Sequence, residues 1–161
     1  MNRAVFFDRD GVINNNDDNY YVYRTEDFQI NAGVIEALKT LQDKQFFLFI
    51  ISNQSGIAKG IYSKEDTENV HWFLEKMLQE SDIYISEIYY CPHHPDIENC
   101  FCRKPESLLI EKAIARFDLD PEKSWIIGDS DRDILAGERV GLNSILIKKN
   151  EDIRKYLHLI I

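Results

Sequence analysis

Short apolar runs alternate along this chain with longer segments in which apolar residues recur every three or four positions. The short runs are typical of buried β-strands, and they lie at residues 4–7, 46–51, 83–90, 125–128 and 144–147. The longer segments predict helices over residues 33–43, 63–80, 105–117 and 130–141, with a short C-terminal helix or tail at 152–161. Strands that alternate with helices in this way predict a doubly wound parallel sheet covered on both faces, a three-layer α/β/α fold.

Length and composition fit one globular domain that spans residues 1–161. With 44% hydrophobic residues, the chain can bury a core. A net charge of −9 argues against nucleic acid or an anionic membrane as the main partner. No apolar run approaches the roughly 20 residues of a membrane span. Asp8 comes too early for a secretory leader, so we expect a cytoplasmic protein.

Two aspartates follow the first predicted strand, at the edge where open α/β sheets hold their ligands. Asp8 and Asp10 alternate with Arg9, so in an extended chain their side chains leave on the same side. Two neighbouring carboxylates repel each other and a phosphate unless a cation joins them. The pair therefore indicates a nucleophile and a proton carrier around a hard metal ion. The alternative is a solvated strand exit.

Polar residues also follow two other predicted strands. Ser52 ends the second strand, where its hydroxyl and nearby backbone N–H groups could hold a phosphate oxygen or simply form a turn. Asp129 ends the fourth strand, and Asp131 or Asp133 after it fits simple capping of the next helix. Because the carboxyl ends of parallel strands converge, we expect Ser52 and Asp129 to lie near Asp8.

All three cysteines and two of the four histidines fall in one short segment. A ligand set of Cys91, His93, Cys100 and Cys102 has the composition of a tetrahedral zinc site, with His94 as the alternative to His93. Four protein ligands leave no open position, so we predict a structural zinc rather than a catalytic one. The alternative is free thiols in a loop.

Two cations follow the last cysteine directly. Arg103 could bind a phosphate through its guanidinium fork, and Lys104 could bind one as a point charge. The alternative is a solvated basic pair.

Four motifs, in this order, resemble those of the haloacid dehalogenase superfamily in its phosphatase form. Residues 8–14 resemble its first motif, 52–58 the second, Lys104 the third and 128–133 the fourth. The sequence Cys-Pro-His-His-Pro, followed by Cys-Arg-Lys-Pro, is similar to the zinc-binding branch of that superfamily. The branch contains heptose 1,7-bisphosphate phosphatases, which the motifs resemble most, and histidinol-phosphate phosphatases. The resemblance covers about residues 4–146 and implies a core without a large cap domain.

The resemblance implies a role for each motif residue. Asp8 would be the nucleophile that forms an aspartyl-phosphate, and Asp10 would act first as general acid and then as general base. Mg²⁺ would be held by Asp8, Asp129 and the main-chain carbonyl of Asp10. Ser52 and Lys104 would stabilise the transferring phosphoryl group.

Substrate recognition would fall to residues around these motifs. The resemblance implies that Arg103 binds the substrate, including a second phosphate. Further candidates for sugar contacts are Asp18, Tyr21, Asn53 and Gln54.

We therefore expect a Mg²⁺-dependent phosphomonoester hydrolase with a structural zinc, acting as a monomer on a small phosphorylated substrate. The favoured reaction removes the 7-phosphate of D-glycero-D-manno-heptose 1,7-bisphosphate. The alternatives are a histidinol-phosphate phosphatase and a zinc-stabilised binding module that lost catalysis. Two segments near the substrate pocket differ in length from the heptose enzymes, and Ser130 stands where those enzymes often carry lysine. These departures bear on the choice of substrate rather than on the chemistry.

Overall fold

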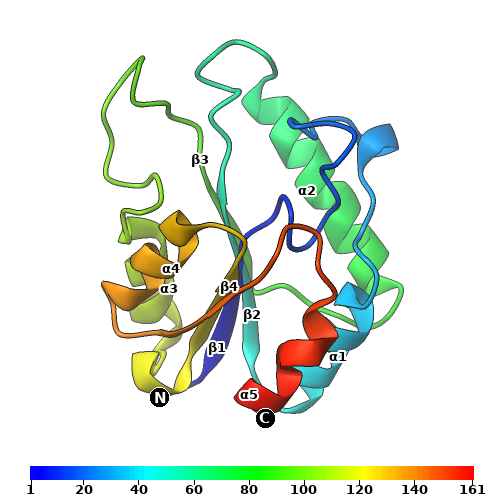
Figure 1. The fold of residues 1–161 in the computed structure, drawn as a ribbon, viewed down its shortest axis with the longest axis vertical. Helices are drawn as coiled ribbons and strands as arrows, with labels where there is room; N and C mark the ends of the chain where they lie inside the picture. The colour runs from blue at the N-terminus through cyan, green and yellow to red at the C-terminus, as the bar shows by residue number, and fades with distance from the viewer.

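The computed structural model describes all residues, 1–161, and contains one five-stranded sheet (Figure 1). The strands run in the order β3-β2-β1-β4-β5, and every neighbouring pair is parallel. Their bounds are β1 Ala4–Phe7, β2 Phe47–Asn53, β3 Glu87–Cys91, β4 Trp125–Gly128 and β5 Asn143–Leu146. The predicted doubly wound parallel sheet is confirmed.

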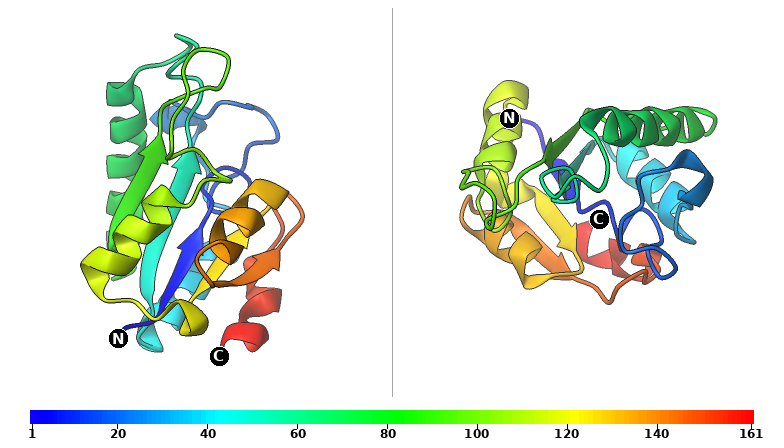
Figure 2. Two further views of the ribbon diagram at one scale, coloured as in Figure 1. Left: turned by 90° about the vertical axis from the view of Figure 1, so that its left-hand side faces the viewer. Right: turned by 90° about the horizontal axis from the view of Figure 1, so that it is seen from above.

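Helices cover both faces of the sheet, so the molecule has three layers (Figure 2). The α-helices are α1 Val34–Asp43, α2 Lys64–Gln79, α3 Leu108–Phe117, α4 Asp131–Glu138 and α5 Leu157–Ile160. Short 3₁₀-helices are η1 Thr25–Asp27, η2 Pro121–Lys123 and η3 Ile153–Tyr156. Helices α1 and α2 lie on one face together with α5, and α3 and α4 lie on the other (Figures 1 and 2). None of the helices combines the length and apolar character that a membrane crossing requires.

The central strand β1 shows why an unbroken apolar run forms in this fold. Its four residues are all fully buried, and successive side chains point to opposite faces. Val5 and Phe7 join the core under α1 and α2, whereas Ala4 and Phe6 join the core under α3 and α4. A strand covered on both faces needs apolar residues at every position, and β1 has them.

Some element boundaries differ from the sequence-based prediction. Helix α3 begins at Leu108 rather than at residue 105, because the chain first forms a turn in which Glu106 N donates to Arg103 O at 2.8 Å. Strand β3 begins only at Glu87, and the buried Ile83 lies in the connection before it. Helix α4 ends at Glu138, and Gly141 takes φ +82° in the turn that follows.

The strand order places a topological switch point at β1. The chain moves from β1 outward to β2 and β3 and then returns to β4 on the other side of β1. Crevices at such a point, beyond the carboxyl ends of the strands, are the usual ligand sites of open α/β sheets. The segments 53–62 and 91–104 extend past these strand ends (Figure 1).

Candidate active site

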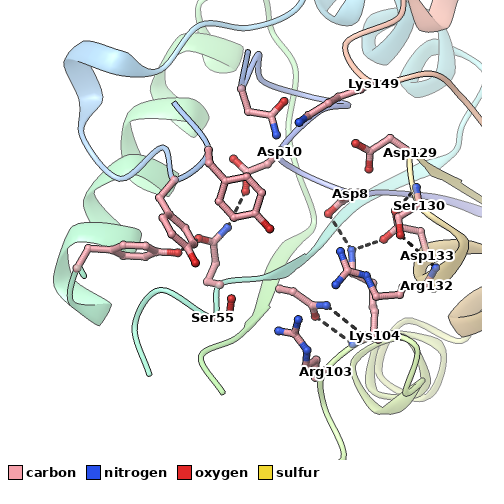
Figure 3. A pocket seen from close by; sticks show the side chains of 16 residues that line it. Asp8, Asp10, Ser55, Arg103, Lys104, Asp129, Ser130, Arg132, Asp133 and Lys149 are labelled. Atoms are coloured by element: carbon pink, nitrogen blue, oxygen red, sulfur yellow. Dashed lines mark hydrogen bonds and ion pairs between the residues drawn. The ribbon is translucent and has the colours of Figure 1, made fainter. Parts of the chain in front are cut away.

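A cavity of about 240 Å³ opens beyond the carboxyl ends of β1, β2 and β4 (Figure 3). Eight of the predicted site residues line it: Asp8, Asp10, Tyr21, Asn53, Gln54, Arg103, Lys104 and Asp129. Further lining residues, which the sequence reasoning did not assign to the site, are Asn16, Tyr20, Ser55, Tyr62, Ser130, Arg132, Asp133 and Lys149. The predicted residues Ser52 and Asp18 do not line the cavity.

The Asp8 carboxylate, just beyond the end of β1, has one oxygen held and one oxygen free. Its Oδ1 accepts hydrogen bonds from the backbone N–H of Arg9 at 2.9 Å and from Lys104 Nζ at 2.8 Å. No protein group donates a hydrogen bond to Oδ2. Burial raises the pKa of Asp8, although Lys104 opposes the shift. The carboxylate is therefore fixed in orientation, with one oxygen available to an electrophile or a cation.

Lys104 is buried and gives all three of its N–H donors to acceptors in this site. Its Nζ donates to Asp8 Oδ1 at 2.8 Å and to the carbonyl of Ile51 at 2.6 Å, and it lies 2.6 Å from Asp133 Oδ1. Burial disfavours the ammonium, but the charges of Asp133 and Asp8 outweigh it and raise the pKa of Lys104. Asn53 holds the backbone of Lys104, accepting from its N–H at 3.0 Å and donating to its carbonyl at 3.1 Å. The ammonium is thus permanently charged and fixed beside the nucleophile candidate.

Asp133 belongs to the site, although the sequence offered only helix capping for it. Its Oδ2 does accept from the backbone N–H of Ser130 at 3.2 Å, which completes a capping box at the start of α4. The side chain is only 2% exposed, however, and its other oxygen pairs with Lys104. Asp131, in the same helical turn, is exposed. The sequence did contain a signal for this role, since Asp133 follows Asp129 by four residues. A helix that begins at the end of a strand brings its first turn back toward the site.

The structure brings three carboxylates together in a group suited to a hard cation. Ligand oxygens of Asp8, Asp129 and Asp133, the carboxylate cluster, all lie within 4.8 Å of one another. Lys104 supplies a single positive charge against these three carboxylates. Burial raises the pKa of Asp129, so its charged form is disfavoured without a further cation. A divalent cation with oxygen ligands fits this donor set and would offset the excess negative charge.

Gly11 allows Asp129 to approach the first strand end. A Cβ at Gly11 would lie 2.3 Å from Asp129 Oδ2, and its φ of +86° is one that L-residues rarely adopt. A second close approach of this kind occurs at Gly128, where a Cβ would lie 2.2 Å from that of Asp133. Glycine at both positions is therefore a requirement for close approach of the carboxylate cluster.

The Asp10 carboxylate is held away from Lys104 by a separate set of donors. Its Oδ1 accepts from Arg9 Nη2 at 2.7 Å and from Asn14 Nδ2 at 3.0 Å. Its Oδ2 accepts only from Gln54 Nε2, at 3.0 Å (Figure 3). Gln54 Oε1 in turn accepts from the hydroxyl of Tyr62 at 2.5 Å. Gln54 therefore orients Asp10. It also lines the cavity, so its contact with a sugar stays a prediction.

The remaining predicted residues differ in where they lie. Ser52 is buried behind Gln54, and its Oγ accepts from Gln54 Nε2 at 2.7 Å. Tyr21 lines the cavity, and its hydroxyl lies 3.5 Å from Lys59 Nζ. Asp18 is exposed and lies outside the cavity.

Three further cations stand around the cavity. Arg103 is half-buried and donates to the carbonyl of His93 at 3.4 Å, while Arg132 and Lys149 are exposed and form no ion pair. Lys149 and Arg103 lie on opposite sides of Asp8 (Figure 3). An anionic ligand would therefore meet positive charge at the mouth of a site whose floor is acidic.

A second cluster, formed by Cys91, His93, Cys100 and Cys102, has ligand atoms that all lie within 4.8 Å of one another. Cys91 Sγ is 2.9 Å from Cys102 Sγ and 3.6 Å from Cys100 Sγ, and His93 Nδ1 is 3.2 Å from Cys102 Sγ. A tetrahedral zinc ion with bonds of about 2.3 Å to sulfur separates its ligands by roughly 3.5–3.8 Å. The 3.6 Å between Cys91 and Cys100 falls in this range, whereas the two distances to Cys102 are shorter and would have to lengthen around an ion. The composition and spacing of this cysteine cluster fit such an ion.

The geometry distinguishes the two candidate histidines. His93 turns Nδ1 to the thiols and Nε2 to Glu98, at 3.3 Å, an arrangement typical of a metal-bound imidazole with an outer carboxylate. His94 turns away, and its Nδ1 accepts from the backbone N–H of Asp96 at 3.1 Å. The structure therefore favours His93.

Comparison with known proteins finds related phosphatases. A family model described as HAD-hydrolase-like matches residues 101–158. The D-glycero-beta-D-manno-heptose-1,7-bisphosphate 7-phosphatase of Haemophilus ducreyi is 38% identical over 94% of this chain and 86% of its own length. The D-glycero-alpha-D-manno-heptose-1,7-bisphosphate 7-phosphatase of Campylobacter jejuni is 40% identical over 92% of this chain and 84% of its own.

A solved structure shares the whole fold. The D,D-heptose 1,7-bisphosphate phosphatase from B. bronchiseptica, complexed with magnesium and phosphate, superimposes with a TM-score of 0.85 and 28% identity, covering 98% of this chain and 86% of that one. The chain belongs to the haloacid dehalogenase-like phosphatases.

Proposed function

We propose that this protein hydrolyses phosphomonoesters through an aspartyl-phosphate on Asp8. The observation that carries the proposal is the free Oδ2 of Asp8, held in a fixed orientation beside the charged Lys104. Oδ2 attacks phosphorus while the bond from phosphorus to the leaving oxygen breaks, and Asp10 gives its proton to that oxygen. Asp10 then takes a proton from a water molecule that attacks the aspartyl-phosphate, which releases phosphate and restores Asp8.

Mg²⁺ bound by Asp8, Asp129 and the main-chain carbonyl of Asp10 would neutralise charge on the phosphoryl group. Support for this ion comes from the excess negative charge of the carboxylate cluster and from the magnesium in the B. bronchiseptica structure. Lys104 would stabilise the phosphoryl oxygens in this proposal. The same role for Ser52 would require its buried hydroxyl, which accepts from Gln54, to be uncovered first. Lys104 has no spare donor in the present geometry, so a phosphoryl oxygen must replace one of its three acceptors.

We propose D-glycero-D-manno-heptose 1,7-bisphosphate as the substrate, with loss of its 7-phosphate. The names of the bacterial relatives support the sugar, and they include enzymes for both the alpha and the beta anomer. Arg103, at the cavity mouth, would bind the phosphate that is not transferred, because its guanidinium can form paired hydrogen bonds with phosphate oxygens. Tyr21, at the cavity wall, remains a candidate for a sugar contact.

Phosphate release in the presence of Mg²⁺ tests the proposed reaction. The substrates are the beta and alpha heptose bisphosphates and histidinol phosphate, with Asp8→Asn as the inactive control. We expect rapid release from one heptose anomer and none from the variant, whose fold should be intact by circular dichroism. Turnover of histidinol phosphate alone would reassign the substrate. Substantial turnover by Asp8→Asn would reject the nucleophile.

We also propose that the cysteine cluster binds a structural Zn²⁺ through Cys91, His93, Cys100 and Cys102. Support comes from the convergence of the four donors, which leaves no position for a substrate. The metal would order a long loop whose last proposed ligand, Cys102, lies two residues before Lys104. A monomeric state and a cytoplasmic location stay predictions.

A further inference from the structure

Arg9 is an unusual residue to find at the centre of this molecule. Its side chain is 1% exposed, although an unpaired guanidinium is costly to bury. Four of its N–H bonds reach acceptors: two to Asp10 Oδ1 at 2.7 and 3.2 Å, one to the carbonyl of Val22 at 2.7 Å and one to His71 Nε2 at 3.2 Å. The proposed reaction so far gives this network no task.

The way Arg9 contacts Asp10 leaves one carboxylate oxygen for chemistry. Both N–H groups, from Nε and Nη2, meet Oδ1, and Asn14 donates to the same atom. A proton on Oδ1 would face three donors, so the proton that Asp10 transfers must reside on Oδ2. Oδ2 has a single partner, Gln54. The network therefore assigns the two oxygens different tasks: Oδ1 anchors the carboxylate and Oδ2 carries the proton.

His71 on α2 completes the anchor from the side opposite Asp10. Arginine is a donor only, so His71 Nε2 must accept, which makes the imidazole neutral with its proton on Nδ1. His71 is 6% exposed, and its ring packs edge-on against Tyr90 at a centroid distance of 5.5 Å. The contact joins residues 62 positions apart in the chain, and it fixes the rotation of the guanidinium plane that holds Asp10.

We propose that His71 is a positioning residue for Asp10 and acts through Arg9. The inference rests on the proposed role of Asp10 as general acid. Without the acceptor at His71, one guanidinium nitrogen is left buried and unpaired, and Arg9 turns to satisfy it. Oδ1 then loses its fixed anchor, and Oδ2 no longer points reliably at the leaving oxygen.

The experiment compares two leaving groups that differ in their need for an acid. An alkyl phosphate (the heptose bisphosphate, or fructose 1,6-bisphosphate if the heptose is not turned over) needs a proton on its departing oxygen. p-Nitrophenyl phosphate does not, because p-nitrophenolate departs as a stable anion. The quantity measured is kcat/KM, which covers only the steps up to the first irreversible release. General acid catalysis typically contributes 10²–10⁴-fold, so a loosened acid should cost about tenfold to a hundredfold.

The variants are His71→Leu, which removes the acceptor, and His71→Gln, whose amide oxygen can replace Nε2. We expect His71→Leu to lower kcat/KM about tenfold or more on the alkyl phosphate and less than about threefold on p-nitrophenyl phosphate. We expect His71→Gln to restore most of the loss. Tyr90→Phe is the control, because it keeps the ring beside His71 and removes only a hydroxyl bonded to Glu68.

Equal losses on the two substrates would overturn the proposal, and so would an alkyl phosphate rate in His71→Leu equal to that of the wild type. If His71→Leu does not fold, His71→Asn takes its place, because its shorter amide stays polar but cannot reach Arg9. The same substrate difference is then required. Failure of the proposed function is recognised separately, because the wild type would release phosphate from neither compound.

Discussion

At the scale of single residues, the site depends on one buried ammonium shared between two aspartates. Lys104 contacts both Asp8 and Asp133, so its place beside the nucleophile candidate depends on a residue that touches no reacting atom. Asp133 also caps α4, and these two tasks use different oxygens of one carboxylate. Its removal should therefore affect activity and stability together.

Asp133→Asn should lower kcat/KM about tenfold to a hundredfold, since a charge-assisted hydrogen bond worth roughly 1.5–3 kcal/mol becomes a neutral one. The amide can satisfy either Lys104 or the Ser130 N–H through its oxygen, but not both. Steady-state kinetics and thermal unfolding measure the two effects. Asp131→Asn, in the same turn but exposed, is the matched control; it should leave kcat/KM unchanged and cost only the roughly 0.3–1 kcal/mol of an acid in the first turn of a helix. Equal behaviour of the two variants would reject the role of Asp133.

His71 gives the molecule a specific sensitivity to acid. Burial, together with the charge of Arg9, lowers the pKa of His71 to about 3. Between about pH 3 and pH 6.5 the unfolded chain binds a proton at this residue and the folded chain does not, so stability falls as the pH falls through this range. The loss at about pH 5, relative to about pH 8, is about 2 kcal/mol from His71 alone.

Urea unfolding of the wild type and of His71→Gln at these two pH values measures this contribution. The glutamine variant cannot titrate, so it should lose about 2 kcal/mol less than the wild type on acidification. Groups that titrate in both proteins cancel in the comparison. Identical losses would show that His71 does not titrate differently in the folded and unfolded chains.

At the scale of elements, the cysteine cluster lies at the end of β3 and within the long connection from it to α3. Residues 92–107 contain no helix or strand, and Ile97 and Phe101 within them are exposed. Few buried apolar contacts are therefore available to hold this connection. It nevertheless carries Arg103 and Lys104 to the cavity, so metal bound at the cluster would serve the active site indirectly.

Cys102→Ser should release zinc, make the connection sensitive to protease and reduce activity, because Lys104 lies two residues away in the chain. Zinc content by metal analysis, limited proteolysis and phosphate release measure the three effects. His94→Gln serves as the control and should keep its zinc, since His94 turns away from the thiols. Zinc loss in His94→Gln with retention in His93→Gln would reverse the ligand choice.

The elements also show which boundaries a sequence can reveal. Helix α2 begins directly after Ser63, in agreement with the predicted range 63–80, because Ser63 and Asp66 form a capping box within one turn of chain. Helix α3 does not begin at Pro105, although proline favours the first turn of a helix. The Asn53 side chain fixes the backbone just before Pro105, because it forms hydrogen bonds with both the N–H and the carbonyl of Lys104. That restraint comes from β2, and no local pattern indicates it.

At the scale of the whole molecule, the same distinction separates the predicted part of the site from the rest. Asp8, Ser52 and Asp129 each end an apolar run, and parallel strands carry their ends to one edge, so the sequence could indicate their convergence. The contact between Arg9 and His71 joins the loop after β1 to helix α2 on the sheet face. The two residues are 62 positions apart and meet only once the layers have packed, so no local sequence pattern could reveal the contact.

The convergence of strand ends also links metal binding to the stability of the whole fold. Asp8 follows β1, Asp129 follows β4 and Asp133 lies on α4, so the carboxylate cluster joins three elements. Without a cation, repulsion among the three carboxylates opposes folding, because only Lys104 balances them. With Mg²⁺ at about 100 times its dissociation constant, binding adds about 2.7 kcal/mol, or roughly 5–10 °C in Tm for a chain of this size.

Asp129→Asn removes one negative charge and one proposed Mg²⁺ ligand. Measurement without and with Mg²⁺ therefore separates the effect of charge repulsion from the effect of metal binding. In EDTA the variant should melt above the wild type, since the cluster has lost part of its repulsion. In saturating Mg²⁺ the order should reverse, since only the wild type gains binding energy. Thermal unfolding in both buffers, at an ionic strength matched with NaCl, measures the crossing. A variant that melts below the wild type in both buffers would mean that Asp129 stabilises the fold for a reason other than the metal.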